Sequence, residues 1–148
     1  MAEVTVRRAR ADDFERVAEL IRTHVRNFYQ RPDPPLDRIR ALLGTLFWGK
    51  EGVILLAEEG GRIVGFAILY FTFSTEHADK IAVLNDVHVV EGVRRGGVGG
   101  ALFDACRSFA KENEFAYLTW QVTKDNQQAQ KFFERMGGTR QDWVTYSI

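Results

Sequence analysis

The spacing of hydrophobic residues changes several times along the chain, and each change predicts the boundary of a structural element. Apolar residues at intervals of three and four indicate helices, whereas alternating or short continuous apolar runs indicate strands. Helical spacing covers residues 14–28, 39–47, 98–110 and 129–136. Strand patterns cover residues 4–9, 53–73, 81–90, 115–122 and 143–148, with a Gly-Gly turn inside the second of these. This order predicts an α/β protein.

Residues 81–122 form one unit, in which a strand, a glycine-rich turn, a helix and a second strand follow one another. Such a unit places its two strands parallel and connects them by a right-handed crossover. The hairpin predicted at 53–73 is antiparallel, so the sheet should be mixed. No repeat, low-complexity tract or linker interrupts the sequence, and we therefore expect a single domain over residues 1–148.

Composition and charge narrow the classes of function. The chain is 45% hydrophobic and 27% charged, with 20 Lys plus Arg against 20 Asp plus Glu. A net charge of zero argues against a protein that binds nucleic acids nonspecifically and against one that binds membrane surfaces. The one cysteine excludes an internal disulfide, and no Cys/His spacing resembles a zinc site. Because no apolar stretch has the length of a signal peptide or a membrane span, we expect a cytoplasmic protein with no metal, nucleic-acid or membrane partner.

Residues 93–100 read VRRGGVGG and lie between a predicted buried strand and a predicted helix. The first turn of a helix leaves backbone amides without partners, and with the helix dipole these amides bind anions such as phosphates. Glycines let the backbone approach a ligand closely, and Arg94 and Arg95 add charge at the rim. A glycine-rich strand-to-helix turn without a ligand is the alternative interpretation.

Two of three known phosphate-binding patterns do not fit this stretch. The kinase-type loop fails because Val98, not lysine, follows Gly97, and the dinucleotide loop fails because Leu102 stands where a third glycine belongs. The third pattern, R-x-x-G-x-G, is matched by Arg94, Gly97 and Gly99.

With this motif the chain resembles the GCN5-related N-acetyltransferase (GNAT) superfamily, whose acyl-CoA pyrophosphate signature is R-x-x-G-x-G. The segments 65–73, 84–103 and 126–138 fall in the order expected for that superfamily. Within it, the chain is most similar to the diamine acetyltransferases, the spermidine/spermine and thialysine group. The resemblance implies a GNAT fold: a mixed six- to seven-stranded sheet, splayed between the strands at 81–90 and 115–122, with about four helices packed on it.

The resemblance also implies acetyl-CoA as co-substrate and places it in the gap between these two strands. The pantetheine arm would bond to the backbone of Val87 and Val89, with Asn126 facing it. The pyrophosphate would meet the residues Arg95, Gly96, Gly97, Val98, Gly99 and Gly100, next to Arg94. From the residues alone, Asn126 fits equally well as the N-cap of the last helix.

The implied reaction is direct attack of a primary amine of a small molecule, diamine-like or amino-acid-like, on the thioester. With a pKa of about 10.4, only a few amines in about ten thousand are neutral at pH 7, so a base is needed. Asp86 is the first candidate and His88 the second, and strand alternation puts both on one face, with Asn85, Val87 and Val89 on the other. A bulge, which is usual here in the family, would change that count.

The chain departs from the family pattern at the acceptor side. Phe133 stands where the family has a proton-donating tyrosine, and Asn85 stands where the diamine enzymes have a glutamate. Phe28 and Tyr29 occupy the place of another acidic residue. The expected acceptor-binding residues are therefore Phe28, Tyr29 and Asn85. Because these side chains are apolar or neutral where the diamine enzymes have carboxylates, they disfavour a polyamine as the acceptor. Tyr29 or Tyr146 could replace the missing tyrosine.

These departures leave alternatives open. The chain could be a catalytically weakened acyl-CoA-binding module, or an acetyltransferase for peptides, proteins or aminoglycosides. A homodimer is a further hypothesis from the resemblance, because dimers are common in the diamine group.

Overall fold

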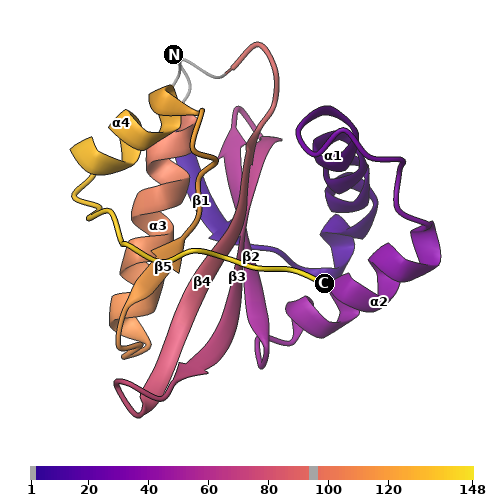
Figure 1. Ribbon diagram of the computed structural model, residues 1–148. Helices are drawn as coiled ribbons and strands as arrows, with labels where there is room; N and C mark the ends of the chain where they lie inside the picture. Colours follow the sequence, from indigo (N-terminus) through magenta and orange to yellow (C-terminus); the bar gives the residue numbers. More distant parts are fainter. Residues whose placement is uncertain (1–2, 94–96) are drawn as a thin grey trace.

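Five strands form one sheet in the order β1-β2-β3-β4-β5, and helices cover both of its faces (Figure 1). The structure is a computed structural model that describes residues 3–93 and 97–148. The strands are β1 (Val4–Arg8), β2 (Gly52–Glu59), β3 (Arg62–Ser74), β4 (Asp79–Val89) and β5 (Leu118–Trp120). The helices are α1 (Phe14–Asn27), α2 (Leu36–Phe47), α3 (Val98–Glu112) and α4 (Gln127–Arg135), and a 3-10 turn (Ala11–Asp13) precedes α1. Strands β1 to β4 pair antiparallel and β5 pairs parallel to β4, so the predicted mixed α/β sheet is confirmed.

Two hydrophobic clusters lie on opposite sides of the sheet. Helices α1 and α2 cover one face, where Val17 and Leu43 pack with Phe66 of β3. Helices α3 and α4 lie on the other face, where Phe103 of α3 packs with Leu69 of β3 (Figure 1). The side chains of alternate residues in each central strand pack into one cluster or the other, which is why these strands are continuously apolar in the sequence.

Over the described residues the sheet has five strands rather than the expected six to seven, because the C-terminal segment forms no strand. The apolar side chains of this segment lie in solvent: Trp143 is 85% exposed and Tyr146 is 90% exposed. A strand needs a partner for its backbone groups, and the neighbouring edge strand β5 has only three residues. The C-terminal segment contacts the residues after β5 through a side-chain hydrogen bond, which Gln121 Nε2 donates to Thr145 Oγ1 (2.9 Å). The strand predicted at 143–148 is therefore wrong.

A β-bulge in β4 changes the alternation of its side chains. Ile68 of β3 pairs with Asp86, but the next residue, Leu69, pairs with Leu84. Asn85 is therefore the extra residue of the bulge and has no partner in the ladder. Such an extra residue bends the strand and re-aims the side chains around it.

Strand β4 keeps β5 beside it for only part of its length. The parallel pairs run from Ala82–Leu118 to Leu84–Trp120 and stop there, while β4 continues along β3 as far as Val89. Within the described residues, one edge of 85–89 thus has no neighbouring strand. This is the opening expected between the strands predicted at 81–90 and 115–122.

A cluster of ion pairs ties the first strand to the start of α1. Arg7 on β1 donates two hydrogen bonds to Asp13, both 2.9 Å long, and one to Glu58 on β2, 2.5 Å long. Asp13 also accepts the backbone N–H of Arg10 at 2.7 Å. These bonds, above all those from Arg7, hold the pKa of the Asp13 carboxyl below its usual range.

Candidate active site

The bulge places Asn85 beside Asp86, although strand alternation predicted the two on opposite faces. Asn85 Nδ2 donates to Asp86 Oδ2 at 3.0 Å and lies 3.4 Å from the hydroxyl of Tyr70, which packs on the α1/α2 side of the sheet. The prediction that Asn85 shares a face with Val87 and Val89 is therefore wrong, because the bulge shifts the count by one residue. Val87 and Val89 themselves lie on the α3 side, as predicted.

Asp86 and His88 share the face covered by α1, where a second histidine joins them. His24 Nε2 lies 3.1 Å from Asp86 Oδ1, and His24 Nδ1 lies 3.1 Å from His88 Nδ1. Both imidazoles are buried, with 6% of His24 and 8% of His88 exposed. The structure thus assembles two histidines and a carboxylate from α1 and β4, elements that are about sixty residues apart in the sequence.

His24 was not among the residues predicted for the site. The signal was present, because His24 follows Ile21 by three residues and precedes Phe28 by four, which places it on the buried face of α1. A titratable side chain on such a face needs a polar partner. The partner could not be found from the sequence, since it lies on β4.

The hydrogen-bond pattern fixes the tautomers of the two rings in their neutral form. An ionised carboxylate only accepts, so His24 Nε2–H donates to Asp86. The other nitrogen of a neutral His24 then carries no proton and must accept, so His88 Nδ1–H donates to it. The order of donors therefore runs from His88 through His24 to Asp86.

Tyr29 completes the surroundings of Asp86. Its hydroxyl donates to Asp86 Oδ1 at 2.5 Å. Burial, and then this bond to the carboxylate, raise the pKa of Tyr29. Burial and the charge of Asp86 likewise raise the pKa of Tyr70. Both phenols therefore keep their protons at neutral pH and serve as donors, not as bases. Phe28, the other expected acceptor-side residue, stacks on the His24 ring with centroids 4.9 Å apart and is 57% exposed.

A pocket of about 200 Å³ opens beside this network, between α1, α2 and the strands β3 and β4. Most of its wall is apolar, with Ile39 and Phe66 among the contributors. Its polar lining consists of His24, Tyr70, Asp86 and Arg38. The geometry thus joins a small apolar hollow to an acid–base network.

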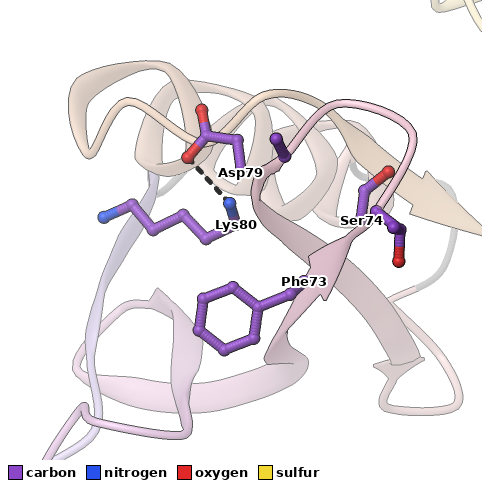
Figure 2. A pocket seen from close by; sticks show the side chains of 6 residues that line it. Phe73, Ser74, Asp79 and Lys80 are labelled. Atoms are coloured by element: carbon purple, nitrogen blue, oxygen red, sulfur yellow. Dashed lines mark hydrogen bonds between the residues drawn. The ribbon is translucent and has the colours of Figure 1, made fainter.

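A larger hollow, of about 400 Å³, lies at the turn between β3 and β4 and is a weaker candidate. Figure 2 shows Phe73, Ser74, Asp79 and Lys80 around it, with the backbone N–H of Lys80 bonded to Asp79 Oδ1 at 2.8 Å. Asp79 lies seven residues before Asp86, or roughly 20 Å along a strand. Phe73 is 82% exposed, and no histidine lines this hollow.

On the other side of β4, the backbone at Val87 and Val89 faces the open edge. Val90 donates its N–H to Val64 of β3 at 2.8 Å. Antiparallel strands bond through alternate residues, so the N–H and C=O groups of Val87 and Val89 point away from β3. They point to the side on which β5 has already ended.

The start of α3 lies next to this edge. Gly97 precedes the helix with φ +79° and ψ +12°, a left-handed conformation that favours glycine. Among the described residues, a Cβ built at Gly97 or Gly100 would meet no atom within 4 Å, and one at Gly99 would meet only Val89 Cγ2 at 4.0 Å. The described part of the chain thus leaves space around these glycines, while Val98 is fully buried and anchors the first turn. Arg94, Arg95 and Gly96 lie outside the described residues.

Asn126 and Phe133 have structural roles in the fold. Asn126 Oδ1 accepts the backbone N–H of Ala129 at 3.1 Å, so it caps α4. Phe133 packs against Phe103 and Trp120, with centroids 5.4 and 5.2 Å away. Tyr146 hydrogen-bonds to none of the described residues.

Two further observations concern metal-binding groups and membrane-spanning helices. Within residues 3–93 and 97–148, no group of three or more His, Cys, Asp or Glu side chains could hold a metal ion. In the same part of the chain, no helix is long and apolar enough to span a membrane.

Known proteins resemble this chain over almost its whole length. The family profile described as "Acetyltransferase (GNAT) family" matches residues 11–138. The chain is 35% identical over 134 residues to "Uncharacterized N-acetyltransferase YhfO" of Bacillus subtilis (strain 168), an alignment that covers 90% of this chain and 89% of the relative.

Solved structures share the fold. One described as a probable acetyltransferase superposes with a TM-score of 0.84 at 28% identity, covering 97% of this chain and 96% of the other. The aminoglycoside N-acetyltransferase AAC(6')-Iy, solved in complex with CoA, gives a TM-score of 0.83 at 15% identity over 100% of this chain and 95% of the other. With a family profile over most of its length and a relative above 30% identity, the chain belongs to the GNAT family of acetyltransferases.

Proposed function

We propose that this protein transfers the acetyl group of acetyl-CoA to a primary amine of a small molecule, by direct attack of the amine on the thioester. The observation that supports this best is the position of Asp86. Its carboxylate lies on β4 at the point where β5 ends, and it is held by His24, Tyr29 and Asn85. An acid–base group thus adjoins both the small pocket and the open edge of β4.

The residues around the open edge fit acyl-CoA. The amides in the first turn of α3 carry the positive end of the helix dipole, which favours a pyrophosphate, and the open space at Gly97 and Gly100 leaves room for it. The outward backbone groups of Val87 and Val89 would bond the pantetheine arm as an added strand does. Arg94, Arg95, Gly96, Val98 and Gly99 complete the proposed phosphate site, and Asn126 is proposed to face the pantetheine. A structural neighbour of this fold was solved with CoA.

When bound, acetyl-CoA supplies the activated acetyl group. Asp86 is proposed as the base, with His88 as the second candidate, so that the attacking amine can lose a proton. The C–N bond forms as the C–S bond breaks, and the N–H of Val89 would stabilise the charge that develops on the thioester oxygen. Tyr29 is a better candidate than Tyr146 for protonating the thiolate, because its hydroxyl lies in the site at Asp86, whereas Tyr146 is 90% exposed.

The test measures thiol release from acetyl-CoA over a panel of primary amines. We expect amine-dependent release that Asp86→Asn lowers by about a hundred- to ten thousand-fold. Amine-independent or absent release would contradict the proposal. The alternative, a weakened acyl-CoA-binding module, is motivated by Phe133, whose ring has no proton to donate. That alternative predicts stabilisation by acetyl-CoA without thiol release, and Phe133→Tyr would then create no activity.

Three narrower expectations remain predictions from the sequence. They are membership of the diamine group, a homodimer and a cytoplasmic location. The small volume of the pocket supports a small-molecule acceptor over a peptide or a multi-ring aminoglycoside, because pockets for drug-sized ligands are about 300–1,000 Å³.

A further inference from the structure

We propose that the acceptor is a small zwitterion: a primary amine joined through a short apolar chain to a carboxylate, as in an ω-amino acid. Its ammonium group would bind at Asp86 and its carboxylate at Arg38, the two residues of opposite charge that line the pocket between α1, α2 and β3. This inference rests on the proposed function and specifies its acceptor.

The amine end is defined by the acceptor sites that remain on Asp86. Its Oδ1 atom accepts from both His24 and Tyr29, whereas Oδ2 accepts, among the described residues, from Asn85 alone. A carboxylate oxygen has two lone-pair sites, so one site on Oδ2 is left for an N–H of the acceptor. The three donors also immobilise the carboxylate, which therefore loses little rotational freedom when the amine binds.

The anion end is defined by a guanidinium that forms no ion pair within residues 3–93 and 97–148. Arg38 lies in the first turn of α2 and lines the pocket, and its side chain makes no ion pair or hydrogen bond with any residue of the described ranges. A planar guanidinium matches a carboxylate with two parallel hydrogen bonds. Arg22 adds a second cation at this rim, since its Nε donates at 3.2 Å to the carbonyl of Pro34, another lining residue. Asp37 precedes Arg38 in the sequence but does not line the pocket.

The wall between the two charged ends is apolar and short. Ile21, Val25, Ile39, Leu42 and Ile68 contribute to it, and the volume of about 200 Å³ suits an acceptor with a few methylene or methyl groups. A diamine would place its second ammonium among these groups or beside Arg38, where no carboxylate of the lining meets it. Such a like-charge contact rejects the wrong ligand.

The experiment compares acceptors that differ only at the far end. Pentylamine, 1,5-diaminopentane and 5-aminopentanoate are five-carbon primary amines whose far ends are a methyl group, an ammonium and a carboxylate. Thiol release from acetyl-CoA gives kcat and KM for each. We expect 5-aminopentanoate to exceed pentylamine in kcat/KM by about ten- to hundred-fold, the range of a charge-assisted hydrogen bond, and the diamine to be the poorest.

Matched variants separate the pocket from general charge effects. Arg38→Gln should raise KM for the carboxylate acceptors by about ten-fold or more. Arg40→Gln removes the same charge from the same helix, but Arg40 stacks over Phe14, 4.4 Å from the ring centroid, and does not line the pocket. It should behave as the native protein. Arg38→Glu should shift the preference toward 1,5-diaminopentane.

The outcomes distinguish the two proposals. Release with pentylamine and the diamine, but without preference for a carboxylate or without an effect of Arg38→Gln, would overturn the acceptor class and leave the acetyltransferase intact. Absence of release with every amine would overturn the proposed function. The pocket is then still tested by the melting temperature, which 5-aminopentanoate should raise in the native protein and not in Arg38→Gln; equal shifts in the two would refute it.

Discussion

The Nδ1 atoms of His24 and His88 face one another at 3.1 Å, so one ring must donate a proton to the other. This arrangement holds only while the pair carries at most one proton between the facing nitrogens, because two N–H groups cannot bond each other. The opposite nitrogen of His24 bonds Asp86, the residue proposed as the base. His24 thereby connects His88 to the proposed base through two side-chain hydrogen bonds.

We predict that His24→Gln alters the pH dependence of thiol release as well as its rate. The substitution removes the ring that joins His88 to Asp86, so kcat should fall by about ten- to hundred-fold, no more than positioned proton transfer contributes. The pH–rate profile should change shape, while KM for acetyl-CoA should stay constant. His77→Gln is the control, because His77 is an exposed residue near the β3–β4 turn. Identical profiles for the two variants would show that His24 only packs.

Tyr29 predicts a pH dependence of stability on the alkaline side. Folding raises its pKa, through burial and the bond to Asp86. A raised pKa contributes stability that is fully present below the unfolded value, about 10 for tyrosine, and is lost as the pH rises above it. The melting temperature of Tyr29→Phe should therefore decline less steeply than that of the native protein above pH 10. Tyr146→Phe, which alters a residue that is 90% exposed, should follow the native curve.

Much of the fold was predictable because its elements are defined by local patterns. The hairpin at Gly60 and Gly61 follows from two glycines between apolar runs, and both adopt positive φ, +59° and +76°. The start of α4 follows from Asn126, whose side chain caps it. The terminal strand was not predictable in this way, because alternation alone cannot show whether a partner strand is available.

The candidate site was predictable only in part, for a related reason. Asp86 and His88 stood out because polar residues interrupt an apolar strand. Their partner His24 lies on α1, and no local pattern shows which strand that face of the helix will meet. Asn85 was assigned to the wrong face because a bulge depends on the pairing of β3 with β4, which periodicity in one strand does not show.

The ion cluster at Arg7 predicts a loss of stability in acid. Folding lowers the pKa of Asp13, chiefly through its bonds to Arg7, so the contribution is present above the unfolded value and is lost as the pH falls through the lower folded value. Asp13→Asn should lower the free energy of unfolding at pH 7 by about 1–3 kcal/mol, the range for a hydrogen bond to a charged group. The difference from the native protein should shrink below pH 4. Asp33→Asn, which breaks the exposed pair with Arg26, should change stability little. An equal loss in both variants, measured by urea denaturation, would contradict this account.

Alanine substitutions of one glycine in α3 and one in α2 distinguish an effect on acetyl-CoA binding from an effect on folding. A Cβ at Gly100, in the first turn of α3, meets no atom of the described chain within 4 Å, and the same holds for Gly44 inside α2. Replacing either glycine by alanine should therefore maintain the melting temperature of the free protein or raise it, since alanine favours a helix by about 1 kcal/mol. Only Gly100→Ala should weaken the stabilisation by acetyl-CoA, because its methyl group would occupy the space proposed for the pyrophosphate.

The two variants can be compared in one thermal-shift titration with acetyl-CoA. Gly97→Ala is less suitable, because φ of +79° at Gly97 strains any other residue and lowers stability directly. If Gly100→Ala and Gly44→Ala bind acetyl-CoA equally well, the first turn of α3 does not hold the phosphates. If both lose binding, the effect comes from the helices in general. A loss confined to Gly100→Ala, at unchanged stability of the free protein, would locate the pyrophosphate at this helix end.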